Sequence, residues 1–267
     1  MSPENRHTVN LEIGGKAIRL VTADPDFRAL LAARYGAFVN PSANTELELS
    51  LQLRNPPAAA PDEDVRVAFQ NGQWLVTRGD FRSVWHPHSG TGIVEQTANP
   101  YSIDTVLRII HTLLLAREGG FLLHASSAIR NHRAFVFSGL SGAGKTTMAR
   151  LAPADVQLLT DEISYIRRES RTHAAYGTPF FGDLGIAGDN VCAPVAALYF
   201  LAKGAGNRID PLGSAEAARL LLRNILFFAK DAGLVRLLFQ AACDFLESVP
   251  AYRLTFFPDV RVWELIQ

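Results

Sequence analysis

A glycine-rich stretch followed closely by two acidic residues is the part of this sequence best suited to chemistry. Residues 139–146 read GLSGAGKT and match the pattern G-x-x-x-x-G-K-[ST] at every fixed position. In such a loop, backbone N–H groups converge on phosphate oxygens, the lysine reaches the β- and γ-phosphates, and the hydroxyl binds Mg²⁺. The sequence therefore predicts a phosphate-binding loop in which Lys145 and Thr146 have these roles.

The surroundings of the motif favour this interpretation over a glycine-rich turn that matches by chance. An apolar segment, RAFVFSG, runs into the loop, and a helical segment, TTMARLA, leaves it, as the motif requires. The residues expected to hold the nucleotide are Gly139, Ser141, Gly142, Ala143, Gly144, Lys145, Thr146 and Thr147.

An acidic pair, Asp161 and Glu162, begins only sixteen residues after Lys145. Two carboxylates next to Mg·ATP can have different roles: one can hold the metal while the other takes a proton from an attacking hydroxyl. The alternative is an acid at a strand end that makes a turn or a cap. The short spacing is unlike that of many phosphate-loop NTPases, whose acidic partner comes much later in the chain.

The strands and the helix around the phosphate loop and the acidic pair predict that these two parts of the chain lie close together. VQLLT, at 156–160, is a short apolar strand with Asp161 at its C-terminal end. A strand–helix–strand unit with a short crossover places its two strands parallel and near one another. The acidic pair is therefore expected at the edge of the sheet beside the phosphate loop, where ligands bind in such sheets.

The first hundred residues are predicted to form an antiparallel sheet with one helix. Gly14-Gly15 and Asn71-Gly72 indicate tight hairpins, and Asp24-Pro25 is typical of a helix start, here for 25–38. Leucines alternate with polar residues over 45–53, further strands are expected near 81–86 and 91–96, and 56–64 is predicted to be a loop. We find no chemistry in this half.

The rest of the chain is predicted to mix helices and strands. Expected helices cover 102–117, 214–230 and 233–247, and expected strands cover 121–129, 133–139, 195–202 and 252–257.

Composition limits the classes of protein. Lys plus Arg and Asp plus Glu both total 26, which argues against bulk binding of nucleic acid or anionic membranes. Cys192 and Cys243 lie far apart, so we expect reduced, buried cysteines rather than a disulfide or a zinc site. The N-terminus has no apolar signal core, and the most apolar segment is interrupted by charges. We expect a soluble, cytoplasmic protein, and the sequence leaves open whether it forms a homo-oligomer.

Taken together, residues from about 103 to 267 resemble the HPr kinase/phosphorylase superfamily, in its shorter HPr-kinase-related branch. His124, in LLHASSAI, precedes the loop by fifteen residues, and the loop is followed by the early acidic pair in LLTDEIS. The segments YGTPFFGDLG, PLGSAEAARLLLRN and PAYRLTFFPDVRVWELI follow in order. The phosphate loop alone is generic, whereas the histidine, the loop and the early acidic pair together are much more specific.

The resemblance implies an α/β fold, α+β overall, with a phosphate-loop domain of the HPr kinase and PEP carboxykinase type containing a mixed sheet. That domain would span 101–267, after a smaller α+β domain at 1–100 that could bind a substrate or partner. By motif position, Lys145 and Thr146 would bind phosphate and metal, while His124, Asp161 and Glu162 would surround the transferring phosphoryl group. Asp183 would be a further acidic residue at the metal site.

The activity implied is that of an ATP- and Mg²⁺-dependent kinase that phosphorylates a serine-type hydroxyl of a peptide, protein or small molecule. Members of the short branch accompany peptide-modifying gene clusters, and others resemble kinases of small molecules. The family's usual Asp-Asp pair is Asp-Glu here; we favour Asp161 as base with Glu162 nearer the metal, and a Walker-B-like arrangement would exchange them. The alternatives are a nucleotide-gated binding module and an NTPase switch. Of two arginines that could contact phosphate, Arg208 and Arg223, the sequence favours Arg208.

Overall fold

The computed structural model describes residues 6–55, 63–170 and 172–267. Most of the loop predicted at 56–64 therefore lies outside the described residues. The chain divides into two compact units, Met1–His111 with Phe228–Ala232, and Thr112–Phe227 with Gly233–Gln267. The division falls inside a helix, α2 (Pro100–Glu118), whereas the sequence suggested a boundary near residue 100.

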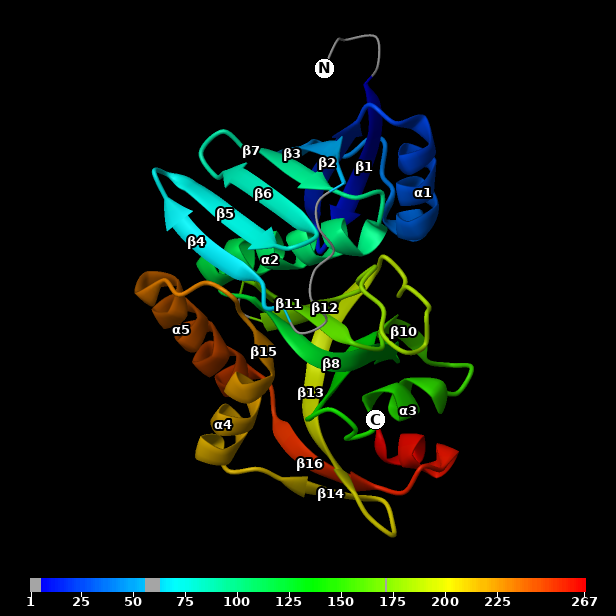
Figure 1. The fold of residues 1–267 in the computed structure, drawn as a ribbon. Coiled ribbons are helices and arrows are strands. Elements are labelled where there is room, and N and C mark those ends of the chain that lie inside the picture. The colour runs from blue at the N-terminus through cyan, green and yellow to red at the C-terminus, as the bar shows by residue number, and fades with distance from the viewer. Residues whose placement is uncertain (1–5, 56–62, 171) are drawn as a thin grey trace. The chain divides into compact units, whose positions relative to one another are not determined.

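The first unit is built on a seven-stranded sheet in the order β1-β2-β3-β7-β6-β5-β4 (Figure 1). Its strands are β1 (His7–Ile13), β2 (Lys16–Thr22), β3 (Leu47–Leu53), β4 (Arg66–Gln70), β5 (Gln73–Arg78), β6 (Phe81–His86) and β7 (Thr91–Gln96). The helix α1 (Pro25–Tyr35) is capped by Asp24, whose side chain accepts a hydrogen bond from the Phe27 N–H at 2.8 Å, and a 3-10 turn, η2 (Gly36–Phe38), follows the helix. Both predicted hairpins are present, because Gly14-Gly15 and Asn71-Gly72 adopt the positive φ that such turns need.

The antiparallel sheet predicted for this unit is wrong in one respect. β3 pairs in parallel with both of its neighbours, β2 and β7, so the sheet is mixed. For the pairing with β2, the reason is that α1 connects β2 to β3 and returns the chain to the end of the sheet at which β2 began. A strand that follows such a crossover runs parallel to the first.

The second unit is also built on a mixed sheet. Its strands are β8 (Phe121–Arg130), β9 (Arg133–Ser138), β10 (Gln157–Thr160), β11 (Ile163–Glu169), β12 (Thr172–Tyr176), β13 (Cys192–Lys203), β14 (Arg208–Pro211), β15 (Ile225–Leu226) and β16 (Ala251–Phe256). Its other helical elements are α3 (Lys145–Arg150), α4 (Ser214–Asn224), α5 (Ala232–Ser248) and the 3-10 segment η3 (Val260–Leu265). The pairings β8–β11, β11–β12, β12–β13, β13–β9 and β9–β8 close a ring of strands.

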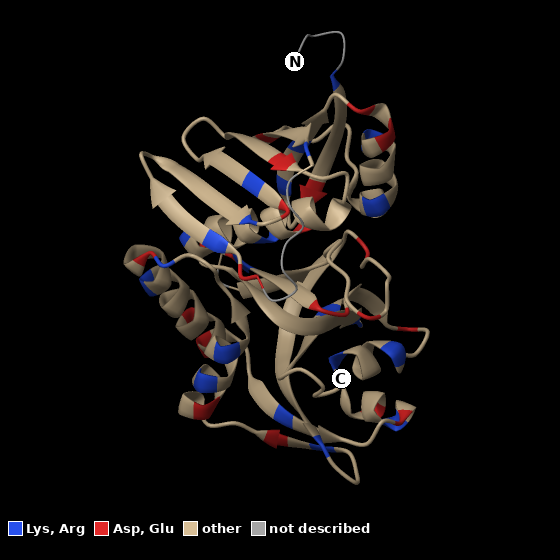
Figure 2. Ribbon diagram, in the orientation of Figure 1, with Lys and Arg blue, Asp and Glu red and all other residues tan. Residues whose placement is uncertain are grey.

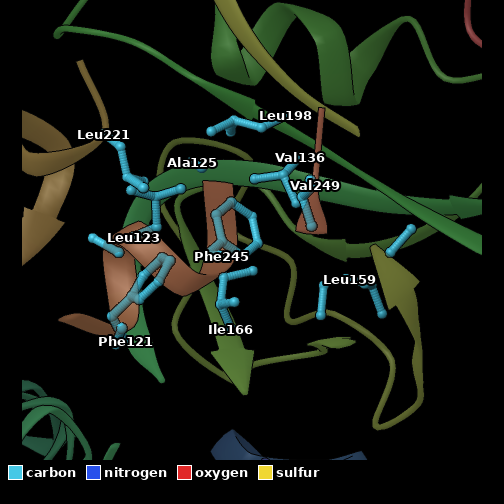
Figure 3. Close-up of a cluster of buried hydrophobic side chains, with 14 of the residues drawn as sticks. Phe121, Leu123, Ala125, Val136, Leu159, Ile166, Leu198, Leu221, Phe245 and Val249 are labelled. Atoms are coloured by element: carbon cyan, nitrogen blue, oxygen red, sulfur yellow. The ribbon is translucent and has the colours of Figure 1, made fainter. Parts of the chain in front are cut away.

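Two apolar clusters hold this unit together. One joins the sheet to α4 and α5 through side chains such as Leu221 and Phe245, which lie against Phe121, Leu123 and their neighbours (Figure 3). The other joins α3 and η3 to the opposite side chains of the strands, with Met148 and Trp263 among its members. The phosphate-loop strand, β9, contributes to both clusters, which fixes the point from which the loop leaves the sheet.

Several details differ from the sequence predictions. The helix predicted over 214–230 ends at Asn224, because Ile225 and Leu226 pair with Leu123 and Leu122 of β8. Neither free cysteine is buried: Cys192 is exposed and Cys243 is partly exposed.

The predicted strands at 156–160 and 133–139 are parallel in direction, as expected, with β8 between them. Within the described residues, none of the helices has the length and apolar character needed to span a bilayer.

Candidate active site

The predicted phosphate loop joins β9 directly to α3. Gly142 and Gly144 adopt φ values of +75° and +113°, in a region that L side chains rarely enter. A Cβ atom at Gly144 would lie 2.5 Å from the Phe256 ring, so a larger residue would also push into β16. Local backbone geometry and packing both require glycine at this position.

Lys145 is buried, and its ammonium group bends back over the start of the loop. Its Nζ donates hydrogen bonds to the carbonyl oxygens of Gly139 at 2.9 Å and Leu140 at 3.3 Å. Burial lowers the pKa of Lys145, while the negative charge of Glu162 acts in the opposite direction. The positive charge is therefore held close to the first residues of the loop and to the acidic pair.

His124 lies on β8, next to the strand that carries the loop. Its neighbour Ala125 pairs with Ser138, and the Ser138 hydroxyl donates to the His124 carbonyl at 3.1 Å. Burial lowers the pKa of His124, and the nearby charge of Lys145 lowers it further. The imidazole is consequently neutral near pH 7, a polar group rather than a cation.

The acidic pair occupies the interruption between β10 and β11. The Thr160 hydroxyl accepts the backbone N–H groups of Glu162 and Ile163, at 3.3 and 3.2 Å, and donates to the Phe180 carbonyl at 3.4 Å. The turn that carries the two carboxylates is therefore joined to the segment that follows β12, a connection that spans about twenty residues of sequence.

The two carboxylates have different surroundings. Asp161 is only 2% exposed, and its oxygens accept the backbone N–H groups of Gly182 at 2.9 Å and Leu184 at 3.0 Å. Glu162 is partly exposed, and its Cβ and Cδ would lie 3.1 and 3.2 Å from a Cβ atom added at Gly182. Asp161 thus holds a loop, and that loop presents Asp183 beside Glu162 at the same cavity.

A cavity of about 420 Å³ collects these groups. Its lining residues are His124, Ser141, Gly142, Gly144, Lys145, Thr146, Thr147, Arg150, Asp161, Glu162, Gly182 and Asp183. Of the residues predicted for the site, Gly139 and Ala143 lie instead on a second cavity, across the loop.

Two lining residues were missed by sequence reasoning. Arg150, at the end of α3, adds a second cation to the cavity, and its signal was a basic residue on the helix that follows the loop. Gly182 has no local signal, because its role depends on the long-range contact with Asp161 and Glu162. Arg208, which the sequence favoured for phosphate contact, is exposed and paired with Asp210 at 2.8 Å, and it lines neither cavity.

The donor set of the cavity fits magnesium bound together with phosphate oxygens. Among the described residues, no group of three or more His, Cys, Asp and Glu side chains forms a metal cage. Mg²⁺ ordinarily needs no such cage, since it binds one or two carboxylates, phosphate oxygens and waters. The Thr146 hydroxyl and the carboxylates of Glu162 and Asp183, all bordering the cavity, are ligands of that kind.

Comparisons with known proteins give a family and likenesses to solved structures. No curated protein matches the chain. Among solved structures, the chain is similar to the Hpr(Ser) kinase/phosphatase from Coxiella burnetii, with 12% identity, 54% of this chain and 85% of that chain covered, and a TM-score of 0.31. At this TM-score the likeness decides nothing about function.

The family model described as SynChlorMet cassette protein ScmC matches residues 93–267, which include the loop, the histidine, the acidic pair and both cavities. The match covers more than half of the chain, and the chain therefore belongs to the ScmC family.

Proposed function

We propose that this protein is an ATP-dependent kinase, related to HPr kinase, that transfers the γ-phosphoryl group to a serine-type hydroxyl. The observation that carries the proposal is the meeting of a complete phosphate loop with His124, Glu162 and Asp183 in one cavity. A loop that only bound Mg·ATP would use one carboxylate for the metal and would need neither a second acid nor a neutral histidine beside its lysine. Phosphoryl transfer uses such groups to position the hydroxyl and to receive its proton.

The proposed reaction is a direct displacement at the γ-phosphorus of ATP. A bond forms from the acceptor's hydroxyl oxygen to phosphorus as the bond from phosphorus to the β–γ bridging oxygen breaks, and ADP leaves. The hydroxyl proton passes to a carboxylate of the cavity. Lys145 and the loop N–H groups neutralise charge on the phosphates, and Arg150 adds positive charge at the end of α3.

The surroundings of the two acids support Glu162 as the proton acceptor, the reverse of the assignment that the sequence favoured. Both oxygens of Asp161 already accept hydrogen bonds from loop amides, so this carboxylate acts as a positioning residue. Glu162 is more exposed, borders the cavity and lies close enough to Lys145 to affect its pKa. A base must reach the hydroxyl from the cavity, and the more exposed position of Glu162 there favours it over the buried Asp161.

Magnesium would be held by the Thr146 hydroxyl and the Asp183 carboxylate, together with phosphate oxygens. When bound, it would neutralise charge on the β- and γ-phosphates. The acceptor is a hydroxyl-bearing molecule rather than nucleic acid, which agrees with the balance of 26 basic and 26 acidic residues and with the mixture of both charges along the ribbon (Figure 2).

The test is transfer from γ-labelled ATP to candidate hydroxyl acceptors by the wild-type protein and Lys145→Ala. We expect Lys145→Ala to lower transfer by about 100-fold or more, because it removes a preorganised charge at the phosphates. Lys230→Ala, at an exposed lysine outside both cavities, is the matched control and should retain full transfer. Equal transfer by Lys145→Ala and wild type would contradict the proposal, and label that passes only to water would indicate an NTPase switch.

A further inference from the structure

A second cavity of about 480 Å³ lies across the phosphate loop from the first. It is bordered by the loop, the end of β13, the last turn of α4 and β16. Figure 1 labels these two strands and this helix. Its lining residues are Gly139, Leu140, Ser141, Gly142, Ala143, Phe200, Leu201, Ala202, Lys203, Leu220, Arg223, Asn224 and Arg253. The proposed kinase reaction, as described so far, gives this cavity no role.

The lining combines apolar walls with positive charge. Phe200 and Leu220 are among the apolar side chains, and three cations, Lys203, Arg223 and Arg253, border the same space. No carboxylate is among the described residues that line it, although Glu216, one turn away on α4, pairs with Arg253. Lys and Arg positions occur on both α4 and β16 (Figure 2). Such a cavity suits a ligand with an apolar body and an anionic group.

The two cavities share two residues in the middle of the loop. Ser141 and Gly142 line both, whereas Thr147 and Arg150 line only the first. Lys145, which in such loops reaches the β- and γ-phosphates, holds its ammonium group against the carbonyls of Gly139 and Leu140. The start of the loop is therefore the γ-phosphate end, and the second cavity opens there.

The position of the second cavity at the start of the loop and its positive charge together indicate the kind of ligand that it binds. The negative charges of ATP lie in its triphosphate, which the first cavity is suited to receive. Arg253 is already paired with Glu216, so Lys203 and Arg223 are the cations of the second cavity that call for another anionic group, carried by a molecule that approaches the γ-phosphate end. We propose, on the basis of the proposed kinase function, that the second cavity binds the body of the phosphoryl acceptor, whose hydroxyl reaches past Ser141 and Gly142 into the first cavity, where Glu162 lies. This acceptor carries a carboxylate next to an apolar group and the reacting hydroxyl.

The proposal is tested by calorimetric titration of small probes into the full-length protein saturated with Mg·ADP. The probes are N-acetyl-leucyl-serine, its C-terminal amide, and free serine. We expect N-acetyl-leucyl-serine to bind at least tenfold more tightly than the amide, which lacks the carboxylate. Free serine, which keeps the carboxylate but lacks the apolar group, should also bind at least tenfold more weakly.

Arg223→Ala should remove most of the difference between the acid and the amide, and Arg223→Lys should keep part of it. Arg223 is exposed, so neither substitution should prevent folding. Arg219→Ala is the matched control, because Arg219 is exposed on the same helix, 3.9 Å from Glu216, and does not line the cavity. Nucleotide affinity, measured in the same variants, should remain within about twofold of wild type.

Equal affinity for acid and amide in the wild type, or an unchanged difference in Arg223→Ala, would overturn the proposal, as would the absence of binding. Because the titration involves no turnover, these outcomes are distinct from failure of the kinase reaction. A probe that binds in the expected manner but is not phosphorylated from ATP would support the cavity assignment and count against the kinase function.

Discussion

Asp104 in the first unit and Asp161 in the second are both buried, but their partners differ in kind. The Arg34 guanidinium holds Asp104 through both of its oxygens, and the Tyr35 hydroxyl donates to it at 2.6 Å. Asp161 instead accepts two backbone N–H groups, from Gly182 and Leu184. One carboxylate is neutralised by a cation from another helix, and the other fixes the path of a loop.

This difference distinguishes Asp104, a structural acid that joins two helices, from Asp161, an acid that positions a loop. An ion pair between side chains joins α1 to α2, and the charge it uses is not available to a ligand. Bonds to backbone amides do not engage the side chain of Asp183, so the loop held by Asp161 presents Asp183 to the cavity. A buried carboxylate that holds a loop at the edge of a polar cavity is therefore better evidence for a site than burial alone.

The largest effect on stability is expected at the structural acid. Asp104→Asn should lower the free energy of unfolding by about 3–5 kcal/mol, because it removes the buried carboxylate that both Arg34 and Tyr35 bind, while Arg34 keeps its charge. Urea denaturation measures the loss. Glu95→Gln is the control: Glu95 faces Arg82 at 3.8 Å in an exposed pair, whose loss should cost less than about 1 kcal/mol. Equal losses in the two variants would contradict the distinction.

Asp161→Asn should affect the site more than the fold. Asparagine offers one oxygen and one NH₂ group, so one of the two loop amides loses its acceptor, a cost of about 1–3 kcal/mol. We expect phosphoryl transfer to fall about 10- to 100-fold. Amide hydrogen exchange at Gly182 and Leu184 should become faster, and this readout does not depend on activity.

Glu162→Gln sharpens the same comparison. It should also reduce transfer, by about 100-fold if Glu162 receives the proton, but it should leave exchange at Gly182 and Leu184 as in the wild type. If Asp161→Asn left both exchange and transfer unchanged, Asp161 would not be a positioning residue. If Glu162→Gln kept full transfer, the base would be a different group.

A third buried titratable residue, His111, lies on the same helix as Asp104, and its protonation should make the stability of the protein depend on pH. Burial lowers the pKa of His111 to about 3, and the charge of Lys16 adds to this. The unfolded state, with an ordinary histidine pKa of about 6.5, binds the proton more readily. Stability should therefore fall as pH decreases from about 6.5 toward about 3, by up to about 1.4 kcal/mol per pH unit.

His111→Leu removes the side chain that binds this proton in the unfolded state. The slope of the unfolding free energy against pH should therefore decrease by up to about 1.4 kcal/mol per pH unit. Urea denaturation at several pH values between 4 and 7 measures the slope in both proteins. An identical slope in wild type and variant would show that His111 does not contribute to the pH dependence.

The smallest effect is expected at an acid that holds a single amide. Asp24 caps α1 by accepting the Phe27 N–H at 2.8 Å. Asp24→Ala should lower the free energy of unfolding by about 1 kcal/mol, whereas Asp24→Ser, which keeps an oxygen at the cap, should lose less. A loss in Asp24→Ser as large as that in Asp24→Ala would indicate that the side-chain cap is not the cause.

Elements with strong local signals could be predicted from the sequence. Both glycine-containing hairpins, α1, α2 and the strands at 81–86 and 91–96 are present where the sequence indicated them, because turn residues and apolar periodicity act over a few neighbouring positions. The parallel pairing of β3 and the early end of α4 were not predicted. Each depends on a partner strand distant in the sequence, which for α4 is β8.

For the site, the sequence by itself determined the loop: its glycines, Lys145, Thr146, and the strand and helix on either side all lie within about twenty consecutive residues. The tertiary structure decided which carboxylate holds the 182–184 segment, that Arg150 borders the first cavity, and that Arg223 rather than Arg208 borders the second. The physical reason is the separation along the sequence of the residues that specify each feature. A glycine-rich turn is specified by the conformations open to its own residues, whereas the surroundings of a side chain depend on a ring of strands that closes only when β13 pairs with both β9 and β12.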